Sequence, residues 1–340
     1  MKFKSLSLLA LCLAVGIVSC KKDDDNEIPQ VEIRDRAEQQ KADNDSILKY
    51  LNNHYYNKAE IDAAVPNIGI EDVVITELVD GETLPEGHMM LIDAVGDPIA
   101  VEYADTDYEY YVLKLNQGGG YDSPTLADNV QILYEGFTLQ DKVFDGKYYP
   151  DNNPLDLTGL IQGWRYVIPD YNTSESYTDN GDGTISYNNS GVGVMFLPSG
   201  LAYFANATGG ISAYSPIVFK FELLQMGQND HDADGIPSYL EGLTENTDED
   251  TYSDGFGLYP RYDYIDADDD GDGVFTADEI EVRTVTKTMR EEVLAEPLTE
   301  DEVLLNFIEK DKNGNYIGTI VKLIDSNGDG TPDYLDPEAN

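Results

Sequence analysis

Three twelve-residue stretches in the last third of the chain repeat one pattern of acids and glycine. They are DHDADGIPSYLE (230–241), DDDGDGVFTADE (268–279) and DSNGDGTPDYLD (325–336). Each has oxygen-bearing side chains at positions 1, 3 and 5, glycine at 6 and a carboxylate at 12, the spacing of a calcium-binding loop. Residues 228–340 contain 31 acidic and 7 basic residues, a net charge of −24 out of −45 for the chain. Such a segment is expected to fold by binding cations, because it has little apolar sequence for a core.

The predicted ligands follow from the position of each residue within its loop. The side-chain ligands are Asp230, Asp232, Asp234 and Glu241, then Asp268, Asp270, Asp272 and Glu279, then Asp325, Asn327, Asp329 and Asp336. The backbone carbonyls at position 7 are those of Ile236, Val274 and Thr331. A fourth, degenerate site could use some of Asp248, Asp250, Asp254, Asp263 and Asp266. A solvated acidic linker without metal is the alternative interpretation.

Two of the loops contain a proline, in the segments GIPSYLE and GTPDYLD. These segments resemble thrombospondin type 3 and dockerin-like repeats more than the helix–loop–helix of EF-hand sensors. Extracellular calcium modules bind in roughly the 10⁻⁴–10⁻³ M range, so the predicted Ca²⁺ is structural and permanently bound.

The first 20 residues predict an export signal. Lys2 and Lys4 precede an apolar run, residues 6–18, that is short for a membrane span. The run ends in IVSC, which resembles the lipobox of bacterial lipoproteins and implies cleavage before Cys20 and acylation of Cys20, palmitate included. KKDDD then resembles the signal that sends some lipoproteins to the outer face of the outer membrane. An ordinary secretory signal and a plain charged tether are the alternatives. We therefore predict a signal peptide at 1–19, a lipidated tether at 20–33, and membrane attachment through this lipid.

The remaining chain divides by its patterns. A helix is predicted within residues 34–56 from Ala37, Ile47, Leu48 and Leu51, and short strands within 68–105. Stronger strands are predicted at YEYYVLKL, NVQILYEGFTL, GVGVMFL and PIVFKFELLQM, and a hairpin turn at TDNGDGT. The predicted domains are 34–107, 108–227 and 228–340. The charge of −45 excludes a nucleic-acid partner, because a polyanion is repelled by DNA.

The single tryptophan stands in an ordered set of motifs. ILYEGFT, VFDG, LIQGW, LPSGLAYF and SPIVFKFELL follow one another between residues 132 and 224. This set resembles FKBP-type peptidyl-prolyl cis-trans isomerases over roughly residues 110–226. The resemblance implies an α+β fold in which a curved antiparallel sheet wraps a short helix, with the loop-rich calcium-repeat region following it.

The same resemblance implies a catalytic pocket and its clients, the prolyl-containing polypeptides of the cell envelope. The pocket residues are Tyr134, Phe144, Asp145, Leu160, Ile161, Trp164, Tyr203, Ile211 and Phe219. The family's pattern places Trp164 beneath the proline ring, and the Tyr203 hydroxyl and the Ile161 N–H on peptide carbonyls. A dry aromatic pocket favours the twisted, less dipolar amide, so catalysis needs no cofactor.

Several positions depart from the family's pattern. Leu155 stands where an aromatic residue is usual, and Phe204 replaces a glycine after Tyr203. Residues 165–190 look expanded. The first predicted function is a lipid-anchored prolyl isomerase of the cell envelope. The departures would also fit a second function, a catalytically weak prolyl-peptide-binding protein or chaperone with a calcium-stabilised stalk. A structural surface lipoprotein is the third predicted function.

Overall fold

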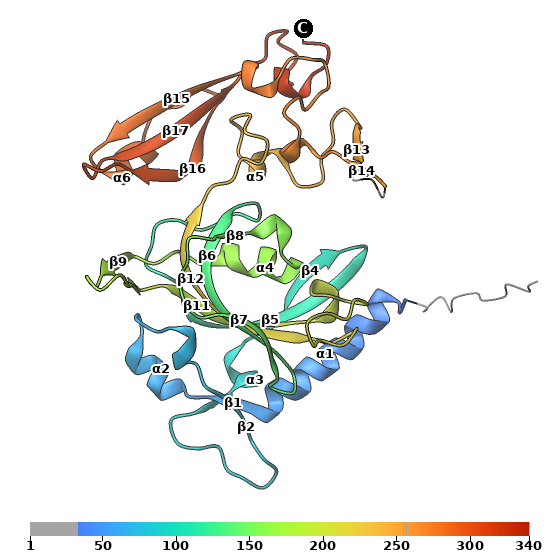
Figure 1. Ribbon diagram of the computed structural model, residues 1–340, viewed down its shortest axis with the longest axis vertical. Coiled ribbons are helices and arrows are strands. Elements are labelled where there is room, and N and C mark those ends of the chain that lie inside the picture. The colour runs from blue at the N-terminus through green and yellow to red at the C-terminus, as the bar shows by residue number, and fades with distance from the viewer. Residues whose placement is uncertain (1–32, 254, 256, 340) are drawn as a thin grey trace, which may run out of the picture. The chain divides into compact units, whose positions relative to one another are not determined.

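The computed structural model describes residues 33–253, 255 and 257–339 (Figure 1). The predicted signal peptide, Cys20 and nearly all of the predicted tether lie outside the described residues. Asp35–Asn340 forms one compact unit. Of the helices in the described residues, none has the length and apolar character needed to cross a membrane.

The predicted N-terminal helix is confirmed as α1 (Arg36–Asn53), which begins after Asp35, whose carboxylate accepts from the Glu38 N–H at 2.9 Å. Ile47 and Leu51 are fully buried, as the spacing predicts, but Ala37 is exposed. Three short strands follow around this helix: β1 (His54–Tyr56) lies between β2 (Ile75–Glu77) and β3 (Met89–Met90). The helices α2 (Lys58–Ala64), η1 (Ile70–Asp72) and α3 (Leu91–Ala94) complete the segment. Within residues 68–105, where short strands are predicted, residues 91–94 form the helix α3 instead.

One antiparallel sheet dominates the region that follows. Its order is β4-β5-β11-β12-β6-β7, and β8 also pairs with β6. The strands are β4 (Ile99–Tyr103), β5 (Thr106–Asn116), β6 (Asn129–Thr138), β7 (Val143–Lys147), β8 (Leu155–Asp156), β11 (Gly191–Leu197) and β12 (Ile217–Gly227). The four strong strand predictions are confirmed, and so is a mixed helix-and-sheet class with antiparallel sheets.

Both faces of this sheet are covered. The short helix α4 (Gln162–Val167), flanked by η2 (Leu157–Gly159) and η3 (Ile168–Asp170), packs on one face. Residues of α1 and the short strands pack on the other. Side chains alternate along a strand, so in β11 Val194 and Phe196 face α1 whereas Met195 and Leu197 face α4. All seven residues of β11 are buried.

The predicted hairpin turn is confirmed between β9 (Ser176–Asp179) and β10 (Ile185–Asn188), which pair antiparallel. Gly181 and Gly183 have φ of +76° and +91°, a backbone region that favours glycine. After β11, η4 (Ser199–Leu201) begins the segment that leads to Tyr203.

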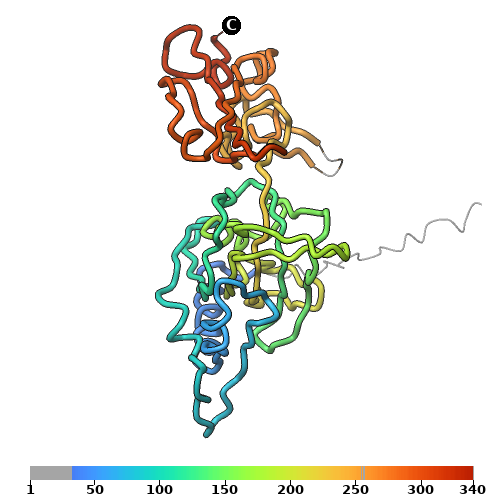
Figure 2. Tube along the Cα trace, turned by 90° about the vertical axis from the view of Figure 1, so that its left-hand side faces the viewer, coloured from blue at the N-terminus to red at the C-terminus, as the bar shows by residue number. Residues whose placement is uncertain are grey.

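The acid-rich region, residues 228–339, is the gold to red part of the trace in Figure 2. Its described residues contain more regular structure than its composition predicts. The strands β15 (Ile280–Lys287), β17 (Tyr316–Leu323) and β16 (Glu302–Lys310) form a sheet in that order, and β13 (Thr251–Ser253) pairs with β14 (Leu258–Pro260). The helices are α5 (Ser238–Glu241), η5 (Asp263–Ile265), η6 (Thr276–Asp278), α6 (Arg290–Leu294) and η7 (Asp333–Leu335). Its small apolar core contains Ile236, Ile280, Leu305, Val321 and Tyr334.

Candidate functional site

An aromatic cluster surrounds the single tryptophan. Trp164 lies in α4, and its indole is 4% exposed. The ring centroid of Phe219, on β12, is 5.0 Å from that of Trp164, and the Tyr134 ring, on β6, is 5.6 Å away at 72°. Phe144, on β7, stands edge-on to Phe219 at 5.5 Å. Tilted and edge-on ring pairs at these distances add to the apolar burial of the cluster.

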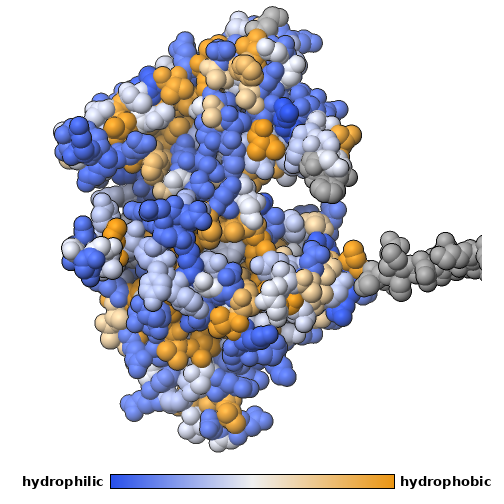
Figure 3. Space-filling model, viewed as in Figure 1, coloured by the Kyte–Doolittle hydropathy of each residue, from blue (hydrophilic) through white to orange (hydrophobic). Residues whose placement is uncertain are grey.

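The other predicted pocket residues surround this cluster. Trp164 and Phe219 are buried, and so is Ile211, which is 4% exposed. The side chains that remain half-buried around them, which we call the rim, are Tyr134, Phe144, Leu160, Ile161 and Tyr203. On the face drawn in Figure 3, hydrophobic side chains gather near the position of α4. The structure thus brings together the predicted apolar residues, with the indole beneath a half-exposed rim.

A polar group adjoins the rim. The Tyr134 hydroxyl donates to the Asp145 carboxylate at 3.0 Å, and burial, with this hydrogen bond, raises the pKa of Tyr134 to about 12. Burial and then the charge of Asp145 raise the pKa of Tyr203 as well. Both phenols therefore stay protonated at neutral pH and can donate to a carbonyl. Within the described residues, the Tyr203 hydroxyl and the Ile161 N–H form no hydrogen bond.

Two residues of α1 hold the segment that carries Tyr203, and sequence reasoning missed both. The carboxylate of Asp43, 2% exposed, accepts from the Ser199 N–H at 2.8 Å and from the Ser199 hydroxyl at 2.6 Å. The Arg36 guanidinium lies 4.3 Å from the centre of the Phe204 ring. The buried face of α1 also carries Gln39 and Gln40, so the apolar pattern of the helix offered no signal for this contact.

Glycine at position 136 allows two rings of the cluster to pack against β6. A Cβ there would lie 2.5 Å from the Phe219 ring and 2.8 Å from the Phe144 ring. No such neighbour exists at Gly159, where a Cβ would meet nothing within 4 Å. Gly136 therefore keeps the aromatic cluster close to the sheet.

Several cavities have linings that do not include Trp164. One of about 590 Å³ is lined by residues that include Ile70, Tyr148 and Glu222, and one of about 160 Å³ includes Phe137 and Lys220. Burial raises the pKa of Glu222 to about 7.

The three acidic loops fold alike. In each, the aspartate at position 1 accepts from the glycine N–H at position 6: Asp230 from Gly235 at 3.1 Å, Asp268 from Gly273 at 3.5 Å and Asp325 from Gly330 at 3.0 Å. These glycines have φ between +95° and +103°. The aspartate at position 5 accepts from the N–H at position 7 in every loop, at 2.7–2.8 Å. The repeat seen in the sequence is therefore a repeat of backbone geometry.

Within these loops, carboxylates gather in two groups, with a third group between the loops. The members of each group have oxygens within 4.8 Å of one another. The groups are Asp232, Asp234, Glu241 and Asp269, then Asp268, Asp270 and Asp272, then Asp248, Asp250 and Asp266. The third matches part of the degenerate site, but the Arg261 guanidinium already lies 3.7 Å from Asp250 and 3.4 Å from Asp266. Asp269, at a non-ligand position of its loop, was missed by sequence reasoning.

The other predicted ligands lie outside these groups. Asp230 and Glu279 belong to none of them. In the third loop the Asn327 amide donates to Asp336 at 2.7 Å, and Asp325 and Asp329 accept from backbone N–H groups. Ile236, Val274 and Thr331 each follow the positive-φ glycine of their loop. Calcium binding by the three loops stays a prediction.

Burial strongly disfavours charge in the first group. Desolvation, and then repulsion from neighbouring carboxylates, raises the pKa of Glu241 to about 11 and that of Asp269 to about 9. The same two causes raise the pKa of Asp232 to about 7, and desolvation raises that of Asp234 to about 6. A bound cation would offset this repulsion, so the donor set fits a hard, oxygen-loving metal ion.

His231 forms an Asp–His–Ser contact that resembles a catalytic relay only in its distances. Its Nε2 is 3.0 Å from Asp156, and its Nδ1 is 2.8 Å from the Ser238 hydroxyl. Ser238 is fully buried, and its oxygen also accepts from the His231 N–H. A sealed hydroxyl cannot attack a substrate, so the contact is structural.

Two solved structures are similar to part of the chain. A peptidyl-prolyl cis-trans isomerase from Pseudomonas syringae pv. tomato str. DC3000 is 24% identical, with a TM-score of 0.30 over 40% of this chain and 87% of that one. FkpA from Escherichia coli is 23% identical, with a TM-score of 0.29 over 37% of this chain and 51% of FkpA. This chain thus spans about half the length of FkpA. No protein-family model matches the chain, and no curated protein matches it.

Proposed function

We propose that residues 108–227 form an FKBP-like domain, with a curved sheet around α4, that catalyses peptidyl-prolyl cis-trans isomerisation. The observation that carries the proposal is the buried indole of Trp164 beneath a half-exposed aromatic rim, with the Tyr203 hydroxyl and the Ile161 N–H left without partners in the described residues. A prolyl ring would rest on this rim, and its flanking carbonyls would accept from these two donors.

The residues supply the chemistry by excluding water. Rotation about an Xaa–Pro bond has a barrier of about 18–20 kcal/mol, because amide resonance gives the C–N bond double-bond character. Water stabilises the planar, dipolar amide, and aromatic surface does not. Transferring the prolyl amide from water to the rim therefore favours the twisted amide of the transition state. Each 1.36 kcal/mol of that preference is about tenfold in rate.

The test is an isomerisation assay on a short Xaa-Pro peptide, comparing the wild-type chain with Tyr203→Phe and Trp164→Phe. Loss of the Tyr203 hydrogen bond, worth about 0.5–1.5 kcal/mol, should lower kcat/KM by up to tenfold. Trp164→Phe should lower it further, because the largest ring of the cluster is reduced. Tyr187→Phe is the matched control, since its hydroxyl bonds Gln131 at 3.1 Å, outside the cluster. A wild-type chain no faster than Tyr203→Phe and Trp164→Phe would end the enzyme proposal.

A second candidate function is prolyl-peptide binding with little turnover, as in a chaperone. The low exposure of Trp164, 4%, favours it, because little of the indole is open to a prolyl ring. Saturable peptide binding that Tyr203→Phe weakens, without isomerisation, would select this candidate.

The proposal extends to the rest of the chain. The acid-rich region would be a calcium-stabilised module, as the shared loop geometry and the buried carboxylates favour. The IVSC segment supports lipid attachment at Cys20 in the outer membrane, where the domain would act on exported polypeptides. Metabolic labelling with a palmitate analogue tests this anchor, and Cys20→Ser should remove the label.

A further inference from the structure

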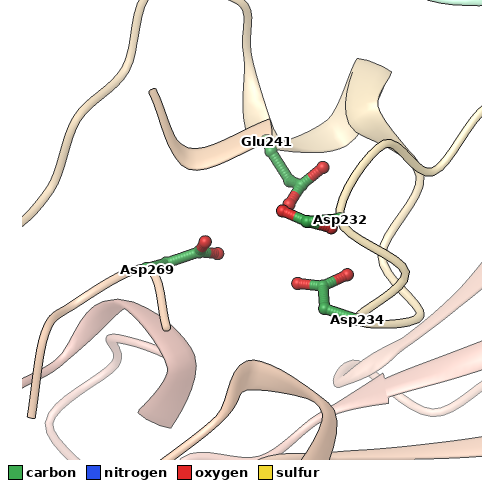
Figure 4. Close-up of side chains that lie close together, drawn as sticks. All are labelled: Asp232, Asp234, Glu241 and Asp269. Atoms are coloured by element: carbon green, nitrogen blue, oxygen red, sulfur yellow. The ribbon is translucent and has the colours of Figure 1, made fainter. Parts of the chain in front are cut away.

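Four carboxylates meet at one point of the acid-rich region (Figure 4). Asp232, Asp234 and Glu241 come from the first loop and α5. The Asp269 carboxylate reaches toward them from the opposite side, from the start of the second loop. All four place an oxygen within 4.8 Å of the others.

These carboxylates are buried and lack partners. Asp269 is 1% exposed and Glu241 is 6% exposed. In the described residues, neither oxygen of Asp269, Glu241 or Asp232 has a hydrogen-bond partner, nor has Oδ2 of Asp234. No lysine, arginine or histidine of the described chain forms an ion pair with any of the four. Charged groups are buried in this way only when something else compensates them.

We propose that these four carboxylates bind one Ca²⁺ that joins the first loop to the second. This inference deepens the proposed calcium module and rests on it. The ligand set consists of hard oxygen donors without histidine or cysteine, which suits Ca²⁺ better than a transition metal. Ca²⁺ also tolerates an irregular shell of six to eight oxygens, whereas Mg²⁺ requires near-ideal octahedral geometry.

The site differs from the one that the loop spacing predicts. Asp230 accepts from the backbone N–H groups of Ala233 at 2.8 Å and Gly235 at 3.1 Å, so it shapes the turn. Asp269 supplies the fourth carboxylate of the proposed site, although it stands at position 2 of its own loop. The site is therefore shared between two loops, and each loop alone is incomplete.

The experiment uses the full-length chain and Asp269→Asn, with calcium binding followed by isothermal titration calorimetry and thermal unfolding measured in Ca²⁺ and in EDTA. In Ca²⁺, Asp269→Asn should weaken one site at least tenfold and lower the Tm of the calcium-dependent transition. In EDTA the sign reverses, because the substitution removes a buried acid whose oxygens have no partner, and it should raise that Tm. A residue with a purely structural role would lower the Tm in both.

Asp278→Asn is the matched control, an exposed aspartate of the same loop outside the group. It should bind Ca²⁺ like the wild type. If Ca²⁺ stabilises the wild-type chain and Asp269→Asn binds it unchanged, the shared site is wrong and the calcium module stands. If Ca²⁺ neither binds nor stabilises the wild-type chain, both fail. A Tm lowered by Asp269→Asn in EDTA also overturns the shared site.

Discussion

The sheet region buries mainly apolar side chains, whereas the acid-rich region also buries several carboxylates. The cluster between the sheet and α4 contains 17 buried hydrophobic residues, whereas the core of the acid-rich region contains five. The acid-rich region instead buries carboxylates, among them Asp234, Glu241 and Asp269. Burial of apolar surface stabilises a fold without help, and burial of unpaired charge destabilises it. The sheet region is thus stabilised by its own apolar core, and the acid-rich region would gain stability from a cation at the proposed calcium sites.

Removing calcium should produce the largest difference in stability between the two regions. At a calcium concentration 100 times the Kd, each site contributes about 2.7 kcal/mol to the folded form, and EDTA removes this contribution. We expect limited proteolysis in EDTA to cleave within 228–340 while residues 36–227 resist. Equal resistance of the acid-rich region with and without Ca²⁺ would remove the contrast.

One buried acid, Glu222, should make the stability of the sheet region depend on pH. Glu222 is 8% exposed, and burial raises its pKa from 4.5 to about 7. Because the folded pKa lies above the unfolded value, the stabilisation is complete below about pH 4.5 and is lost as the pH rises to about 7. The loss should approach 3 kcal/mol, at about 1.36 kcal/mol for each pKa unit.

Urea unfolding followed by the fluorescence of the single tryptophan measures this effect. Glu222→Gln should flatten the dependence, whereas Glu102→Gln, an exposed control on β4, should keep it. A wild-type profile that is flat between pH 4.5 and 7 would contradict the buried acid.

The smallest expected effect tests the packing of the aromatic cluster. Gly136→Ala places a methyl group 2.5 Å from the Phe219 ring, so the rings must move, and overpacking of this kind costs about 1–3 kcal/mol. Isomerase activity should fall with stability, and calcium binding should not change. Gly159→Ala, where the added methyl group meets nothing within 4 Å, is the control for replacing a glycine without overpacking.

The sequence predicted the individual strands and helices better than it predicted which of them pack against one another. Alternating apolar residues in YEYYVLKL predicted β5 correctly, and the short apolar run GVGVMFL predicted β11, because both patterns are local properties of the sequence. The cover of the second face by α1 was not predicted. GVGVMFL carries a signal for it, since a continuous apolar run indicates a strand buried on both faces.

The candidate sites follow the same rule. The family resemblance of the sequence predicted which apolar residues surround Trp164, and the structure places them in one cluster. Loop spacing could not find Asp269, because its neighbours in space are Asp232 and Glu241, 28 or more positions earlier. The Asp43–Ser199 contact spans 156 residues and is equally invisible to local patterns.

The hydrogen bonds between Asp43, on α1, and Ser199 have a mechanical consequence. A pull on the chain ahead of Arg36 enters the folded region through α1, the helix whose Asp43 holds that turn. Tension would therefore act on the segment bearing Tyr203 and also on β5, because Gln40 and Asn44 of α1 bond to Glu109. If the N-terminus is tethered, drag on the anchored molecule would act on the rim and on β5 together.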